Sequence, residues 1–237
     1  MENGLHKKQR IEIIDALRGL AIVLMIIHHF LYDIVEFLNA PSWLFSNSVF
    51  NVLHYIFAGV FICLCGVSSN FSRSNLKRGF ITMIIAGFLT IITYIIDMPI
   101  IFGILHLLSV CMIFYGLTEK LWNLIPKWIT PIFTIAGTLI SLWCLNNITV
   151  KSRNLWIFGW DYKGFVSYDY FPILPWIFIF LFGTWLGYYI KEHKFPRWFY
   201  TTKIPILSTV GKHSLIIYIV HQPILFSLTM LLKVFIN

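Results

Sequence analysis

Charged residues are scarce in this sequence. They make up only 12% of its 237 residues, whereas a typical soluble domain has about 25%. Hydrophobic residues account for 58%, and the mean hydropathy is +0.79. This composition argues against a soluble globular domain and predicts an integral membrane protein.

Acidic residues are especially few, at 10 against 18 Lys and Arg, which leaves a net charge of +8. Such an excess can mark a nucleic-acid-binding protein. Here the basic residues lie in short clusters between apolar runs, which is typical of membrane topology. The expected partner is therefore the lipid bilayer and not nucleic acid.

Cysteines are also few, and all four fall inside apolar runs, at Cys63, Cys65, Cys111 and Cys144. Cys63 and Cys65 project from different faces of a helix, so no metal site is expected. A small-residue cleavage site is missing after the first apolar run, which is also too long for a signal-peptide core. That run is interpreted as a retained first helix.

Apolar runs that could cross a bilayer recur along the chain, since a span needs about 20 residues. Pro99 in "DMPI" separates the third run from the fourth. The sequence predicts an all-α bundle of about seven transmembrane helices in a single domain, residues 1–237. The predicted spans are 14–36, 49–69, 79–97, 100–118, 128–146, 171–190 and 208–232.

Basic residues alternate between the predicted loops, and they mark the cytoplasmic side. Loops 37–48 and 97–100 have none, and loop 147–170 has Lys151, Arg153 and Lys163, partly offset by Asp161 and Asp169. We therefore expect a cytoplasmic N-terminus, an external C-terminus and a multi-pass protein of the cell (plasma or inner) membrane. The residues expected in the cytoplasm include Lys7, Lys8, Arg10, Arg73, Lys77, Arg78, Lys120, Lys127, Lys191, Lys194, Arg197, Lys203 and Lys212.

Ionisable residues interrupt the first span, "IDALRGLAIVLMIIHHFLYDIVEF". At 100° per residue, Asp15, Arg18, His29 and Asp33 share one face, and His28 points a quarter-turn away. Ionisable groups are costly inside a bilayer and usually face a protein interior. The shared face predicts a polar interior next to this helix.

Histidines also occur in other spans, mostly in the predicted outer half. Each has a structural alternative: His54 as an interfacial residue, His106 as a packing residue, and His221 as a polar group beside the break at Pro223. Their common depth instead favours one shared site. Ser109 lies about one helical turn after His106, Tyr218 lies about one turn before His221, and Gln222 directly follows His221.

A histidine beside a carboxylate is the usual general-base arrangement, because the carboxylate orients the ring and stabilises its protonated form. Asp33 follows His29 by one helical turn. The spacing predicts that His29 is a base oriented by Asp33.

These residues resemble a known group of proteins. "Asp-x-x-Arg-Gly-Leu-Ala", followed by a histidine eleven residues after the arginine, resembles the first-helix signature of the transmembrane acyltransferase superfamily. Three further stretches resemble the small bacterial branch of heparan-alpha-glucosaminide N-acetyltransferase relatives within it: "FGILHLLSV", "DYFPILPWIFIFLFGTWLG" and "GKHSLIIYIVHQPIL".

The resemblance implies transfer of an acetyl group from cytosolic acetyl-CoA to a glycan or small-molecule acceptor at or across the membrane. Arg10, Asp15 and Arg18 match the charged motif of the family, and His29 matches the first-helix histidine of acyltransferase-3 proteins. The animal lysosomal enzyme has its catalytic histidine in the first luminal loop, where Ala40 stands here in "NAPSW". Either another histidine is therefore the catalytic one, or the activity is absent.

On this hypothesis His29 deprotonates the acceptor, and His106 hydrogen-bonds the thioester or the acceptor. For most of the basic residues near coenzyme A, topology alone is a sufficient explanation, with Arg18 the exception. The cofactor-binding residues would be Arg10, Asp15, Arg18, Arg78 and Lys212, with Arg73, Lys77 and Lys203 also near the phosphates. The substrate site would include His28, His54, Ser109, Tyr218, His221 and Gln222.

Two other functions stay open at this stage. The same histidines and Asp33 could form a proton or substrate path in a transporter, although the internal repeats that would support this are not evident. The chain could also be a non-catalytic partner of an envelope-polymer assembly. The acceptor, N- against O-acetylation, and the oligomeric state, with a homodimer as one option, also stay open.

Overall fold

A computed structural model describes residues 10–150 and 152–236, and over these ranges it is helical without strands. The basic residues Lys7, Lys8 and Lys151 lie outside the described residues. The main helices are α1 (Glu12–Leu38), α2 (Ser48–Ser69), α3 (Asn75–Ile95), α4 (Ile104–Leu124), α5 (Ile129–Asn147), α6 (Trp176–Lys191), α7 (Arg197–Thr201), α8 (Pro205–Lys212) and α9 (Ser214–Ile236). Two short 3-10 turns, η1 (Ser42–Leu44) and η2 (Trp156–Phe158), lie in the loops.

Within this described part, six helices are long and apolar enough to cross a membrane: α1 to α5 and α9. The prediction of a helical membrane protein is confirmed. Helix α6 is apolar but has 16 residues, which at 1.5 Å per residue is about 24 Å, less than the ~30 Å of a bilayer core. The structure therefore gives six candidate spans and one shorter apolar helix, where the sequence predicts seven spans.

Several predicted helix boundaries differ from the structure: α3 begins before the predicted residue 79, and α4 begins after the predicted residue 100 and ends beyond residue 118. Two further differences have a clear local cause. The predicted span 171–190 begins as a helix only at Trp176, because Pro172 and Pro175 precede it and Pro175 serves as the N-cap residue. The predicted span 208–232 is divided at His213 into α8 and α9. Helix α8 is thus a separate short helix, and α9 begins later than predicted.

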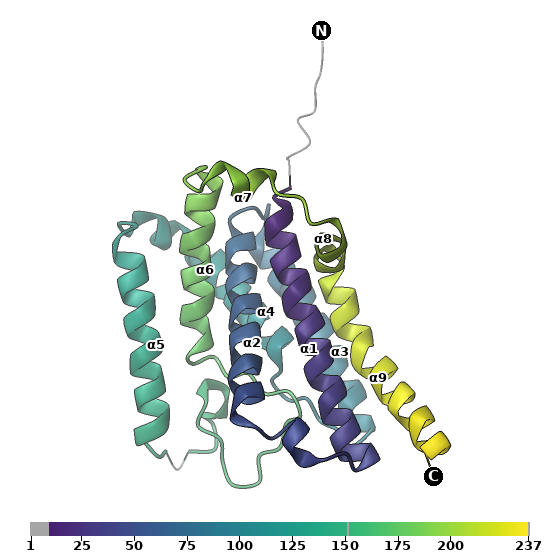
Figure 1. Cartoon of the computed structure of the whole chain (residues 1–237). Helices are drawn as coiled ribbons and strands as arrows, with labels where there is room; N and C mark the ends of the chain where they lie inside the picture. The colour runs from purple at the N-terminus through teal and green to yellow at the C-terminus, as the bar shows by residue number, and fades with distance from the viewer. Residues whose placement is uncertain (1–9, 151, 237) are drawn as a thin grey trace. The chain divides into compact units, whose positions relative to one another are not determined.

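The chain forms two compact units, with the boundary inside α2. The first unit consists of Met1–Phe61 and Phe195–Asn237, and the second of Ile62–Lys194. In the first unit α1 packs along α8 and α9, although these segments are far apart in the sequence (Figure 1).

Glycines allow α1 and α8 to approach closely. A Cβ atom on Gly211 would lie 1.7 Å from the backbone oxygen of Asp15, and one on Gly19 would lie 2.0 Å from that of Leu207. Small residues at such contacts are typical of helix pairs in membranes. The contact holds α8 against the N-terminal half of α1.

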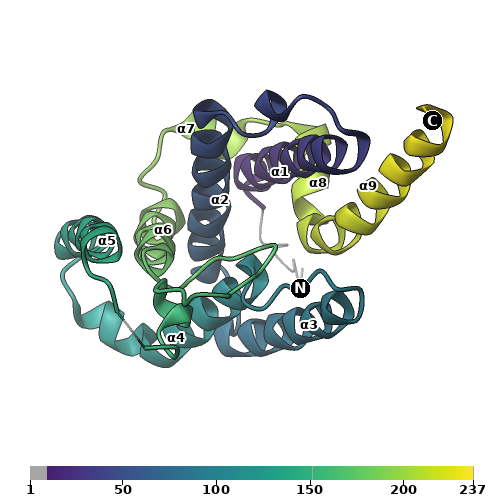
Figure 2. The ribbon, with the colours of Figure 1, turned by 90° about the horizontal axis from the view of Figure 1, so that it is seen from below.

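In the second unit α3 packs on α4, and α5 packs on α6 (Figure 2). The part of α2 in this unit meets α6 at two glycines: a Cβ atom on Gly183 would lie 2.0 Å from the oxygen of Cys63, and one on Gly66 would lie 2.1 Å from that of Phe180. These contacts form the buried centre of the unit.

The loop between α5 and α6 pairs with the segment before α4. The backbone N–H of Tyr168 donates to Pro99 O at 3.0 Å, and that of Phe171 donates to Phe102 O at 2.9 Å. Tyr170 donates a hydrogen bond to Trp156 O, and burial, with a smaller effect of Asp161, raises the pKa of Tyr170 to about 12. The loop is therefore tied to the start of α4 and Tyr170 stays protonated near neutral pH.

Candidate active site

Four imidazole rings gather in the first unit. Consecutive α1 residues supply His28 and His29, α2 supplies His54, and α9 supplies His221. The centroid of the His28 ring lies 4.3 Å from that of His54 in a stacked pair, and 5.8 Å from that of His29. The His29 ring lies 5.0 Å from that of His221. The structure thus brings together four of the five histidines predicted to share a site.

The four rings form a row in the order His54, His28, His29 and His221, so His28 and His29 each contact two other rings of the set. The sequence explains the arrangement only in part. Two successive residues of a helix point about 100° apart, so His28 faces α2 while His29 faces α9. We call these four rings the histidine cluster.

Asp33 is fully buried, with 0% of its surface exposed, and its partner is Gln222 of α9. The amide Nε2 of Gln222 donates to the two carboxylate oxygens of Asp33 at 2.9 and 3.2 Å. Among the described residues no hydrogen bond joins Asp33 to His29, so the expected orienting role differs from the structure. The cause is the packing of α9 against α1, which places an amide opposite the carboxylate.

His221 is buried as well, with 8% of its surface exposed. Its Nδ1 lies 2.6 Å from the backbone oxygen of Tyr218 on the same helix. Among the described residues its Nε2 has no hydrogen-bond partner, and neither does the neighbouring Oε1 of Gln222. Both unsatisfied acceptors belong to the segment of α9 that contacts His29 and Asp33.

His106 belongs to the second unit and has partners there. The N–H of Gly103 meets its Nδ1 at 3.3 Å, and Thr90 Oγ1 lies 3.3 Å from its Nε2. Thr90 in turn donates to Ile100 O at 2.6 Å. The predicted neighbour Ser109 is buried and donates to Leu105 O at 2.6 Å. Both nitrogens of His106 are thus engaged at the first turn of α4.

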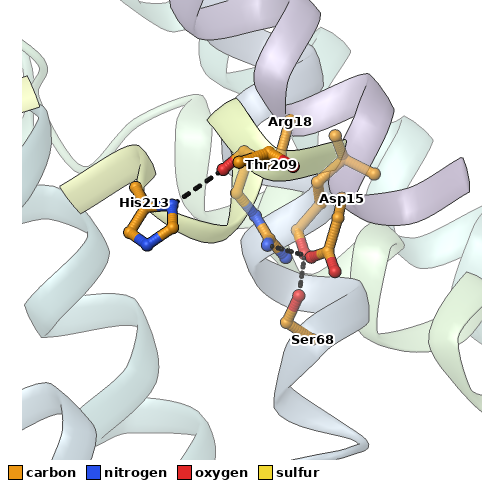
Figure 3. A network of polar contacts seen from close by, with 6 residues as sticks. Asp15, Arg18, Ser68, Thr209 and His213 are labelled. Carbon is orange, nitrogen blue, oxygen red and sulfur yellow. Dashed lines mark hydrogen bonds and ion pairs between the residues drawn. The ribbon is translucent and has the colours of Figure 1, made fainter. Parts of the chain in front are cut away.

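Charged residues meet near the N-terminal end of α1. Arg18 Nη1 pairs with Asp15 Oδ1 at 2.8 Å, and both side chains are mostly buried (Figure 3). The α1–α8 contact brings the end of α8 to this region, where Lys212 is exposed and His213 Nδ1 donates to Thr209 O at 2.9 Å. We call Asp15, Arg18 and Lys212 the charged end of the first unit.

The remaining predicted cofactor residues are more dispersed. Arg10 is exposed just before α1. Arg78 is half-buried in the first turn of α3, in the second unit, while Arg73 and Lys77 near it are exposed. Lys203 is exposed before α8. Among the described residues, no group of three or more His, Cys, Asp or Glu side chains is arranged to hold a metal ion.

Sequence reasoning missed two features of this site. The partnership of Asp33 with Gln222 joins residues far apart in the chain, and its only signal was an amide in the middle of an apolar span. The approach of Gly19 and Gly211 was signalled only by small residues in "LRGLA" and "TVGKH". Both depend on how α8 and α9 pack against α1.

The fold and the site define a multi-pass helical membrane protein with a partly buried histidine cluster in one unit. Residues 10–223 match the family model described as heparan-alpha-glucosaminide N-acetyltransferase, catalytic. The chain belongs to this family, as the resemblance in its motifs predicts. No curated protein and no solved structure matches the chain.

Proposed function

We propose that this protein is a membrane acetyltransferase that moves the acetyl group of acetyl-CoA to an amino or hydroxyl group of a glycan or small molecule. The observation that carries the proposal is the histidine cluster, found in a chain that belongs to an N-acetyltransferase family. Acyl transfer needs a group that accepts a proton from the acceptor, and histidine is the residue that most often does so.

His29 is the base in this proposal. Its ring contacts those of His28 and His221, and it lies on the face of α1 that also contains Arg18 and Asp33. It takes a proton from the acceptor as the acceptor atom attacks the thioester carbonyl carbon. The carbon–sulfur bond then breaks, and the coenzyme A thiolate leaves and takes up a proton.

The charged end of the first unit binds the phosphates of coenzyme A in this proposal. Arg18 is held by Asp15, and Lys212 is exposed at the end of α8, which packs on α1. Arg10, just before α1, is proposed as a further cofactor contact, and the role expected for Arg78 from the sequence stays a prediction. Arg18 precedes His29 by eleven residues, or roughly 16 Å along the helix, so coenzyme A would extend along α1 with its thioester toward His29.

His106 has a structural role in this account. A neutral ring that accepts from Gly103 and donates to Thr90 has both nitrogens in use. It therefore holds the start of α4 and is not a donor to the thioester. The sequence analysis expected His106 to hydrogen-bond the thioester or the acceptor, and this account replaces that role with a structural one.

We also propose that the whole chain works as one transmembrane domain with seven spans, including α6, in the cell membrane. The N-terminus would be cytoplasmic and the C-terminus external, as the distribution of Lys and Arg indicates. Coenzyme A would then reach the charged end from the cytosol.

Purified protein in detergent tests this proposal. With acetyl-CoA and D-glucosamine, the wild type should release coenzyme A thiol and form the acetylated sugar. Arg18→Ala should bind acetyl-CoA at least about tenfold more weakly than Lys120→Ala, since a charge-assisted hydrogen bond contributes ~1.5–3 kcal/mol. Absence of acetyl transfer by the wild type would refute the function, and equal affinities of the two variants would leave Arg18 as a topology signal.

A further inference from the structure

One proton-accepting atom of the histidine cluster is held in a defined chemical state. The partner of His221 Nδ1 is a backbone carbonyl oxygen, at 2.6 Å. A carbonyl oxygen only accepts hydrogen bonds, so Nδ1 must carry the hydrogen. In the neutral ring Nε2 then has a free lone pair, and the hydrogen bond to Tyr218 fixes both this tautomer and the direction of the ring.

The lone pair on Nε2 is buried and unused. The residue is 8% exposed, and no hydrogen-bond partner of Nε2 is found among the described residues. Buried polar atoms are nearly always paired, so an exception needs an explanation. The helical geometry of α9 explains the hydrogen bond made by Nδ1. It does not explain why Nε2 has no hydrogen-bond partner beside the His29 ring.

The titratable and charged groups around His221 come from α1, α2, α8 and α9. From α1 it faces His29, at 5.0 Å between ring centroids, with His28 and His54 beyond that ring. One turn further along α1 is Asp33, which is bonded to the adjacent residue Gln222. Tyr218 contacts the ring from the same helix. Helix α8 ends at Lys212, and His213 connects it to the start of α9.

We propose that His221 is a second catalytic base, which takes the first proton of a protonated amine acceptor through Nε2. This inference rests on the proposed function. An ammonium group loses two protons when it becomes an amide, so two proton acceptors are needed. The cluster supplies two neighbouring rings, and the open Oε1 of Gln222 is an additional acceptor for an N–H of the same group.

The steps balance as follows. His221 Nε2 takes one proton from the ammonium group, which gives the free amine. The amine nitrogen attacks the thioester carbonyl carbon, and His29 takes the second proton. The carbon–sulfur bond breaks, the thiolate sulfur takes the proton from His29, and His221 releases its proton to water. Ammonium and thioester thus give amide, thiol and one proton.

This division of roles predicts different pH profiles for the two histidines. With His221 present, the enzyme accepts the ammonium form, and the rate should change little with pH over the range below the pKa of the amine in which the His221 ring is still unprotonated. Without it, only the free amine reacts, and the rate should fall about tenfold for each pH unit below that pKa. Loss of His29 should lower the rate at every pH without adding this slope.

The experiment measures the rate of acetyl transfer to D-glucosamine against pH for the wild type, His221→Ala, His221→Gln and His29→Ala. Glutamine can accept a hydrogen bond but cannot take the proton. The control is Thr229→Val, because Thr229 is a fully buried residue of the same helix whose hydroxyl has no partner among the described residues. The rates at different pH values are compared within one preparation of each variant, so a reduced folded fraction lowers all of them alike and does not change the slope against pH.

The proposal expects the tenfold slope in His221→Ala and His221→Gln, and a wild-type profile in Thr229→Val. A His221→Ala profile parallel to that of the wild type would overturn it, as would a wild-type profile in His221→Gln. Either result would leave His221 as a packing or hydrogen-bonding residue. Both can be observed only if the wild type transfers acetyl groups, so they are distinct from failure of the proposed function.

Discussion

At the scale of single residues, the pair formed by Asp33 and Gln222 is the most unusual feature of the first unit. A fully buried carboxyl group in an apolar helix is costly without a partner. The Gln222 amide supplies that partner across from α9. The pair therefore fixes the position of α9 along α1, and with it the position of His221 beside His29.

Gln222→Leu should destabilise the protein by about 1–3 kcal/mol, because it leaves the buried Asp33 without a hydrogen-bond donor. Thermal unfolding of the purified protein in detergent measures this. The double variant Asp33→Leu with Gln222→Leu should recover most of the loss, since it removes both polar partners together. A single variant as stable as the wild type would show that the pair does not hold the two helices.

At the scale of elements, the contact between α1 and α8 depends on close backbone approach at Gly19 and Gly211. It also brings the end of α8, which carries Lys212, to the half of α1 that carries Arg18, although these residues are almost two hundred positions apart. The charged end thus exists because of helix packing and not because of a contiguous motif.

Gly211→Ala should destabilise the protein by ~1–3 kcal/mol and weaken acetyl-CoA binding, because the added methyl group forces α8 away from α1. Gly87→Ala in α3 is the matched control, since a Cβ atom there has nothing within 4 Å. Alanine is favoured over glycine inside a helix by roughly 0.5–1 kcal/mol, so the control should unfold at an equal or higher temperature. Equal behaviour of the two variants would contradict the packing argument.

The helices could be predicted from the sequence wherever a long apolar run alone is enough to indicate a membrane-spanning helix. The six long helices follow from it, and Pro99 lies between α3 and α4 as expected. The start of α6 could not be predicted in this way, because the prolines before it delay the helix. The break at His213 could not be predicted either, because it depends on the packing of α8 on α1. The histidines His28, His29, His54 and His221 lie together as their common predicted depth suggests, although His28 was expected on a different face from His29. The partner of Asp33 depended on the register of α9 against α1.

At the scale of the whole molecule, the distribution of Lys and Arg among the loops predicts the orientation of the protein in the membrane. The loops 37–48 and 97–100 contain no Lys or Arg. A tag placed after Asn237, which lies outside the described residues, should therefore be labelled from outside intact cells. Labelling only after permeabilisation would place the C-terminus in the cytoplasm and contradict the proposed seven spans with a cytoplasmic N-terminus.

The most direct test of the whole account is the acetyl-transfer rate of purified His29→Ala beside the wild type, with acetyl-CoA binding measured on the same samples. His193→Asn is the control, because His193 has a positive φ of 54°, which asparagine tolerates. The account predicts that His29→Ala loses ~10²–10⁴-fold in rate, the usual contribution of a general base, while its acetyl-CoA affinity and the control remain close to the wild type. A His29→Ala protein that keeps most of its transfer rate would contradict the account.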